Sequence, residues 1–174
     1  TLINARMSAV NTIEIGKLAV TITYNNGDEI QLFWAITKGD GYKIPSATNK
    51  NEWSTVIRPQ KFAEKLTQVN QQNANKVIPI IKVVKGIVST LPENRQLTGY
   101  HIESLAIEIF KNPTKSQSNR DMLLTFFKQS KDLVKNSIKD KTGQSYRVDD
   151  YLGDINSQKR REASYDLERI YNKM

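Results

Sequence analysis

The stretch YNNGDEIQLFWAI, residues 24–36, joins a tight turn to an apolar strand, and it decides how the N-terminal part of the chain folds. The preceding residues 17–24, KLAVTITY, alternate between apolar and polar side chains, which is the pattern of a strand buried on one side. Residues 30–36 alternate in the same way. The sequence therefore predicts a β-hairpin, with the polar side chain of Gln31 in the middle of its second strand.

The length of the turn fixes which side chains of the hairpin share a face. A two-residue turn, Asn26-Gly27, would set Ile22 opposite Gln31, whereas a three-residue turn sets Ile22 opposite Ile30. The longer turn also gives Gly27 the left-handed position of a type I turn followed by a bulge. We predict the longer turn, because a slip of one residue would move every side chain to the wrong face. The opposite face then carries Glu29, Gln31 and Phe33.

The rest of the chain changes from strand to helix patterns. Residues 2–10 show a short helical pattern, and residues 37–58 are loop-rich. Helical periodicity and capping signals then predict five helices; they begin near Pro59, Lys76, Thr98, Ser118 and Ser157, and the fourth is expected to reach about Ile138. The expected fold class is α+β, a small antiparallel hairpin or sheet followed by a layer of four to five helices.

Composition narrows the classes of function. The 174 residues carry 26 basic and 18 acidic side chains, a net charge of +8, which suits a polyanionic partner such as nucleotide phosphates or RNA. The absence of cysteine excludes disulfides and zinc–thiolate sites and fits a reducing cytoplasm. No apolar run is long enough for a membrane span, and we expect no membrane partner.

The usual catalytic motifs are absent. Metal-assisted phosphoryl transfer needs converging carboxylates, and an Asp-x-Asp pair on a strand supplies them compactly, but the chain has none. Asp149 and Asp150 are adjacent, so they would point apart in an extended chain. His101 is the single histidine, and both it and Glu103 are read as structural residues. No metal-binding residues are predicted.

Six segments follow one another along the chain: VTITYNNGDEIQLFWAI, GYKIPS, EWSTVIRPQKFAEKLTQVN, KVIPIIKVVKGI, LTGYHIESLAIEIF and VDDYLG. In this order they resemble segments of the CD-NTases. These are the cyclic GMP-AMP synthase-like oligonucleotide cyclases of CBASS anti-phage defence. The resemblance runs from about Leu18 to Tyr171 and matches only the C-terminal portion of such an enzyme. It implies that residues 1–58 are the remainder of the nucleotidyltransferase catalytic sheet with a cleft loop, and that residues 59–174 are a helical domain.

The resemblance places the position of the third catalytic acid at Gln31. The family has a hydrophobic-Asp-hydrophobic-hydrophobic-Pro-Ala pattern there, and this chain has IQLFWA, with Trp34 at the Pro position. Gln31 is then expected to face the nucleotide cleft, although an amide oxygen is a poor ligand for a hard cation. Glu29, on the same face, is the weaker alternative.

The resemblance also implies four nucleotide-binding residues. Tyr42 lies in the GYKIP loop beside the cleft, where it either contacts a base or packs locally. Lys82 and Lys85 occupy the segment in which the family has a lysine before an aromatic residue, and Lys85 is the better match for a triphosphate contact. Tyr100 is expected either to stack on a base or to pack in the core, and Gly99 replaces the family's Ser.

Two hypotheses follow. In the first, the chain is the C-terminal part of a cyclic-oligonucleotide synthase that uses nucleoside triphosphates with Mg²⁺ or Mn²⁺ in the intact enzyme. This chain alone is then expected to be inactive and to need no cofactor. In the second, it is a non-catalytic nucleotide- or RNA-binding module with a degenerate metal site. An exposed apolar N-terminal face would favour a homodimer or association with a missing N-terminal half.

Overall fold

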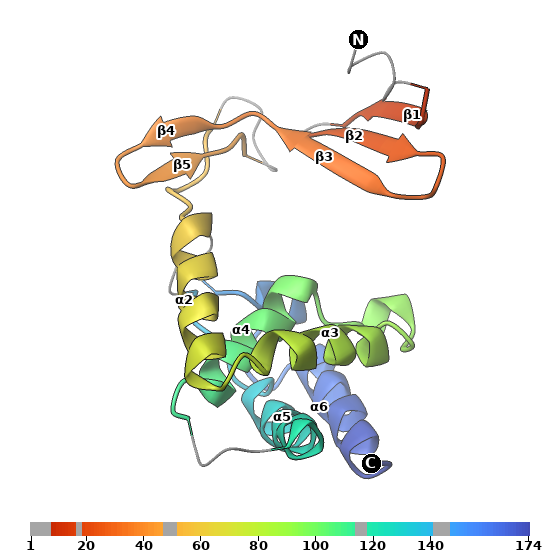
Figure 1. Cartoon of the computed structure of the whole chain (residues 1–174), viewed down its shortest axis with the longest axis vertical. Coiled ribbons are helices and arrows are strands. Elements are labelled where there is room, and N and C mark those ends of the chain that lie inside the picture. The colour runs from red at the N-terminus through yellow and green to blue at the C-terminus, as the bar shows by residue number, and fades with distance from the viewer. Residues whose placement is uncertain (1–7, 17–18, 47–51, 114–117, 141–146) are drawn as a thin grey trace. The chain divides into compact units, whose positions relative to one another are not determined.

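The computed structural model describes residues 8–16, 19–46, 52–113, 118–140 and 147–174. The chain divides into two compact units, Thr1–Arg58 and Pro59–Met174, and each is described by itself. Elements of both units are labelled in Figure 1. None of the helices in the described residues is long and apolar enough to cross a membrane.

The first unit contains a three-stranded antiparallel sheet in the order β1-β2-β3, formed by β1 (Val10–Ile15), β2 (Ala19–Tyr24) and β3 (Glu29–Phe33) (Figure 1). The three-residue turn is confirmed. Ile22 pairs with Ile30 and Thr21 pairs with Gln31, and Gly27 has a φ of +85°. This left-handed conformation is one that glycine adopts without a steric penalty.

The first unit holds more strand than the sequence predicted. The helical pattern expected over residues 2–10 is wrong at its end, because Val10 begins strand β1; residues 2–7 lie outside the described part of the chain. Strand β3 ends at Phe33, so Trp34 is not part of it. The stretch read as loop contains a second hairpin, β4 (Ile36–Lys38) and β5 (Gly41–Lys43). Both misreadings concern very short segments, in which periodicity carries little information.

The second unit is helical, and its helices start where the sequence predicted. They are α2 (Pro59–Gln72), α3 (Val77–Val88), α4 (Gly99–Phe110), α5 (Asn119–Leu133) and α6 (Gln158–Tyr171), with the short 3₁₀ turns η1 (Glu93–Arg95) and η2 (Asp150–Leu152). Helices α5 and α6 pack along each other (Figure 1). Helix α5 stops at Leu133, earlier than the expected end near Ile138.

Side-chain caps define three of the helix starts. The Thr98 hydroxyl accepts a hydrogen bond from the backbone N–H of His101, and Ser157 caps α6 in the same way. Ser118 and Asp121 form a capping box at the start of α5. Hydrogen bonding to Ser118 lowers the pKa of Asp121. Each cap satisfies a backbone donor that the helix leaves without a partner.

The core of the second unit is built from the apolar faces of its helices. Five apolar residues of α3 are buried: Val77, Ile80, Ile81, Val84 and Val88. They pack in one cluster with apolar side chains of α4, α5 and α6, including the fully buried Leu105, Phe126 and Phe127. Burying a side chain of this size contributes roughly 1.5–3 kcal/mol. The helical unit therefore has its own core, and this core fixes the positions of α3 and α4.

Candidate functional site

The N-terminus of α4 meets a lysine of α3. A Cβ added at Gly99, the first residue of α4, would lie 3.3 Å from Nζ of Lys85. The Lys85 ammonium also pairs with Oε1 of Glu103 at 2.5 Å, one turn further along α4. A helix N-terminus carries partial positive charge and free N–H donors. Lys85 and the start of α4 thus form a positively polarised position, which Glu103 partly neutralises.

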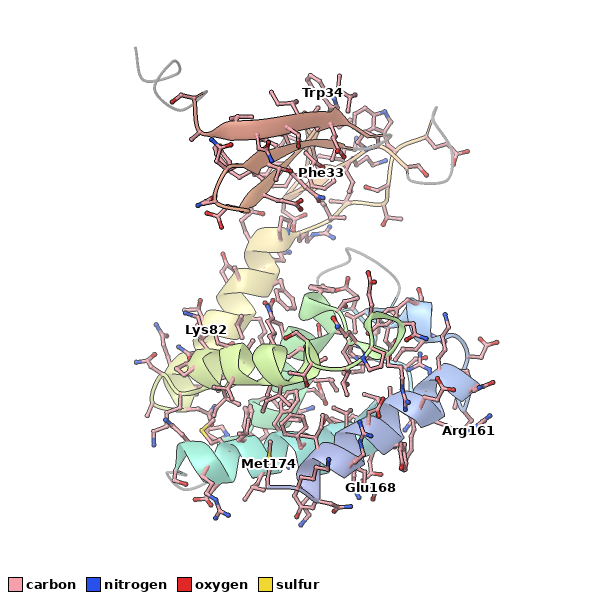
Figure 2. The ribbon with its side chains drawn as sticks, turned by 90° about the vertical axis from the view of Figure 1, so that its right-hand side faces the viewer. Phe33, Trp34, Lys82, Arg161, Glu168 and Met174 are labelled. Atoms are coloured by element: carbon pink, nitrogen blue, oxygen red, sulfur yellow. The ribbon has the colours of Figure 1, made fainter. Side chains whose placement is uncertain are left out.

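Lys82 lies elsewhere on α3. Its side chain is exposed, and Lys82 is labelled in Figure 2. Among the described residues it makes no ion pair, in contrast to Lys85. The structure therefore brings Lys85, but not Lys82, to the start of α4.

Tyr100 is held between two parts of the helical unit. Its hydroxyl donates a hydrogen bond to Oδ1 of Asp140 over 3.0 Å, and its ring lies 4.6 Å from the ring of Phe62, measured between centroids. The two rings are inclined by 44°. Tyr100 is half-buried, so local packing accounts for part of its role, while part of its ring stays accessible.

A cavity of about 190 Å³ opens beside Tyr100, between α2, α4 and the chain after α5. Three ammonium groups and two carboxylates stand among its lining residues: Lys61, Phe62, Lys65, Tyr100, Ser104, Ile107, Glu108, Ile138, Lys139, Asp140 and Val148. Lys61, Lys65 and Lys139 were not predicted from the sequence. A usable signal was present for the first two, because lysines four residues apart lie on one face of a helix.

The buried His101 and the hydroxyl of the partly exposed Tyr151 contact the start of α4. The Tyr151 hydroxyl accepts a hydrogen bond from the backbone N–H of Thr98 at 3.2 Å and lies 2.8 Å from Nδ1 of His101. Burial lowers the pKa of His101 to about 4 and raises the pKa of Tyr151. When His101 is neutral, its Nδ1 can accept a hydrogen bond from the Tyr151 hydroxyl. The pair therefore holds the N-terminal turn of α4 against η2.

The predicted residues of the first unit lie on and beside its sheets. Gln31 is exposed in β3, opposite Thr21 of β2. Glu29 is also exposed, and its Oε1 lies 3.5 Å from the Thr23 hydroxyl that donates to it. Alternation along β3 places Glu29 and Gln31 on the same face of the sheet. These two residues are therefore brought together as expected.

Tyr42 is half-buried in β5 and its backbone forms a bridge with Ile57, with hydrogen bonds of 2.9 and 2.8 Å. Tyr42, Glu29 and Gln31 belong to the first unit, whereas Lys85 and Tyr100 belong to the second. The predicted residues are therefore divided between the two units.

Gln31 and Glu29, on one face of the sheet, do not fit a two-metal centre. No group of three or more histidine, cysteine, aspartate or glutamate side chains able to hold a metal ion occurs in the described part of the chain. The Gln31 amide is neutral, and Glu29 supplies a single carboxylate. A hard divalent cation needs several oxygen ligands, usually with more than one carboxylate. Gln31 and Glu29 therefore do not supply the ligand set of a two-metal centre.

Comparison with known proteins identifies the fold. No protein-family profile matches this chain, and no curated protein sequence matches it. Among solved structures, the CdnE cyclic dinucleotide synthase of Elizabethkingia meningoseptica, determined with GTP and Apcpp, matches 99% of this chain with a TM-score of 0.63 and 15% sequence identity. The chain has a CD-NTase-like fold. It spans 66% of the length of that synthase chain. The expected α+β nucleotidyltransferase-like fold class is thus confirmed.

Proposed function

We propose that this chain is the nucleotide-holding, C-terminal part of a cyclic-oligonucleotide synthase. The observation that carries the proposal is the match of nearly the whole chain, 99%, to one continuous fold, that of a cyclic dinucleotide synthase solved with GTP. The substrates would be nucleoside triphosphates, and the product a cyclic oligonucleotide. The cellular setting would be anti-phage defence of the CBASS type in the cytoplasm, as the resemblance in the sequence implies.

The start of α4 would hold the phosphates. The Lys85 ammonium supplies a full positive charge, and the first N–H groups of α4 supply donors close to it. A phosphate would compete with Glu103 for Lys85, and only a ligand with more negative charge than one carboxylate gains from that exchange. A triphosphate meets this condition.

The accessible part of Tyr100 and the cavity beside it would receive the rest of the nucleotide. Aromatic rings offer stacking surfaces to any base. The lysines at the cavity rim add positive charge, in a unit that contains 20 of the 26 basic residues and 13 of the 18 acidic ones. The charge excess of the chain is therefore concentrated on the unit that would bind the anion.

The first unit would contribute part of the catalytic sheet but none of the acids that bind the metal ions. Gln31 stands at the position of the third acid, and the chain has no Asp-x-Asp pair. We infer that the acids and the Mg²⁺ or Mn²⁺ that they hold belong to the part of an intact synthase with no counterpart in this chain. The 174 residues would bind a nucleotide without turning it over.

A second candidate is a non-catalytic nucleotide- or RNA-binding module. The observation that favours it is the same neutral side chain, because a protein that has lost its metal site needs no acid at Gln31. The coding sequence upstream of Thr1 separates the two. A Gly-Ser pair and an Asp-x-Asp about one strand apart would support the synthase, whereas their absence from the natural protein would support the binding module.

Isothermal titration calorimetry of the purified chain with GTP and with ATP tests the binding shared by both candidates. We expect saturable binding that weakens as salt increases, because phosphate contacts are screened. A duplex and a single-stranded RNA of matched length serve as comparison ligands. Tight RNA binding with no nucleotide binding would contradict the synthase and support the binding module.

A further inference from the structure

A buried carboxylate lies at the cavity beside Tyr100. Asp140 lines this cavity and is only 6% exposed. Its Oδ1 accepts a hydrogen bond from the Tyr100 hydroxyl over 3.0 Å. Burying a carboxylate costs free energy unless donors surround it. The two oxygens of a carboxylate accept about four hydrogen bonds, so Asp140 can bond to Tyr100 and to a ligand in the cavity at the same time.

The backbone before Asp140 holds this carboxylate in place. The N–H of Ile138 donates a hydrogen bond to Oδ2 of the fully buried Asp149 over 3.1 Å. The carbonyl oxygen of Ile138 accepts a hydrogen bond from the N–H of Val148, also over 3.1 Å. Asp140 follows two residues later. Its position at the cavity is therefore fixed by the same contacts that join the two segments of chain.

The rest of the cavity suits a planar ring. Its volume of about 190 Å³ lies below the roughly 300–1,000 Å³ of pockets that enclose a drug-sized ligand. Two aromatic rings, those of Phe62 and Tyr100, and the apolar side chains of Ile107 and Ile138 are among its lining residues. Aromatic side chains offer stacking surfaces to a nucleobase. The cavity has the size and the lining for one base, and not for a whole nucleotide.

We propose that this cavity binds a guanine base, and that the Asp140 carboxylate selects guanine over adenine. This inference rests on the proposed function, and it adds the identity of the base. Guanine presents two neighbouring donors, N1–H and the 2-amino group, which match the two oxygens of a carboxylate as a guanidinium does. Adenine has an acceptor at N1, so it would set a lone pair against Asp140. A site that hydrogen-bonds one ligand in this way discriminates strongly against an analogue without the donors.

The other carboxylate at the cavity is less suited to this role. Glu108 is half-exposed and forms an ion pair with Lys111, three residues further along α4. Water and the lysine compete for its oxygens, which weakens any selection that it makes. The buried Asp140 is therefore the specificity-determining residue.

Calorimetric titration of the complete 174-residue chain with GTP, ITP and ATP tests this proposal. ITP lacks the 2-amino group of GTP but carries the same charge, so the comparison isolates one donor. We expect GTP to bind about tenfold or more tightly than either of the others. Equal affinity for GTP and ITP would overturn the assignment of the base and leave the proposed function standing. If none of the three bound, the proposed function would be contradicted, and this inference with it.

A variant assigns the selection to one residue. Asp140→Asn removes the charge and replaces one acceptor by an N–H donor, so GTP affinity should fall about tenfold while ATP affinity changes much less. Asp132→Asn makes the same change at an exposed residue of α5 that pairs with Lys135, and it should keep the preference for GTP. Circular dichroism shows whether Asp140→Asn folds; if it does not, the comparison of GTP with ITP on the unmodified chain decides. A folded Asp140→Asn that keeps the preference would overturn the proposal.

Discussion

Arg160 and Asp149 form a fully buried ion pair, with Nη1 of Arg160 2.8 Å from Oδ2 of Asp149. The same guanidinium donates to the backbone oxygens of Val134 and Asn136 after α5, and to that of Gly153 after η2. One side chain of α6 therefore ties the end of α5 to the loop that carries η2. Through Tyr151 of η2, this network supports the start of α4, where the nucleotide phosphates are proposed to bind.

Removing one partner of this pair should unfold the helical unit more readily. Asp149→Asn leaves Arg160 charged and buried without its counter-ion, and a change of this kind costs about 3–5 kcal/mol. Urea denaturation followed by circular dichroism measures the loss. The matched control is Asp132→Asn, which breaks an exposed pair with Lys135 and should change stability little. Equal effects from the two variants would show that the buried pair has no special role.

Stability should fall in mild acid because of His101. Burial lowers its pKa from 6.5 to about 4, so the folded chain keeps a neutral imidazole that the unfolded chain protonates. The stability that the neutral imidazole of His101 contributes is complete above pH 6.5, and it is lost as the pH falls from there through about 4. For one proton the slope approaches about 1.4 kcal/mol per pH unit.

Denaturation of the chain and of His101→Gln, at intervals across this pH range, isolates the histidine. The variant should be less stable at neutral pH, because it changes the partner of the Tyr151 hydroxyl, but should lose less stability on acidification. Parallel pH profiles for the two proteins would contradict the assignment of the acid sensitivity to His101.

Nucleotide affinity should depend on Lys85 more than on Lys82. Lys85→Ala removes the ammonium beside the start of α4, whereas Lys82→Ala removes the same charge from an exposed position of the same helix. We expect GTP or ATP binding to weaken about tenfold or more in the first variant, and by a smaller, salt-sensitive amount in the second. Calorimetric titration measures both. Equal losses would indicate binding through general charge and not through this site.

Gly99→Ser should be tolerated and should strengthen nucleotide binding. The added Cβ meets only the flexible end of Lys85, at 3.3–3.4 Å, and the new hydroxyl would stand beside the proposed phosphate position. Replacing glycine where the backbone is already helical also stabilises by about 0.4–1 kcal/mol. Thermal unfolding and calorimetric titration check the two effects, and Gly99→Ala separates the contribution of the hydroxyl from that of the Cβ. A Gly99→Ser variant that binds more weakly than Gly99→Ala would contradict the placement of the phosphate.

Much of the fold could be predicted because local signals agreed with it. The hairpin register followed from matching apolar faces across Gly27, and the helix starts followed from capping residues such as Thr98 and Ser118. Strand β1 could not be predicted, since its apolar residues continue a pattern that also suits a helix. The hairpin β4–β5 has strands of three residues, too short for any periodicity.

The candidate site could be predicted only in part. Lys85 and Tyr100 were identified through a resemblance of short segments, but their surroundings depend on contacts between residues far apart in the sequence. Asp140, which holds the Tyr100 hydroxyl, follows it by 40 residues, and Tyr151 is 50 residues from His101. The Arg160–Asp149 pair was not predicted, because a charged residue in a sequence is usually solvated.

On the proposed function, this chain holds nucleotides without transferring them. The direct measurement is pyrophosphate release by the purified chain with GTP and ATP in the presence of Mg²⁺ or Mn²⁺, alongside calorimetric titration of the same sample. We expect binding with no pyrophosphate above the protein-free background, and no gain from Gln31→Asp, since one added acid does not complete a metal site. Sustained pyrophosphate release by the unmodified chain, or no binding of either nucleotide, would contradict it.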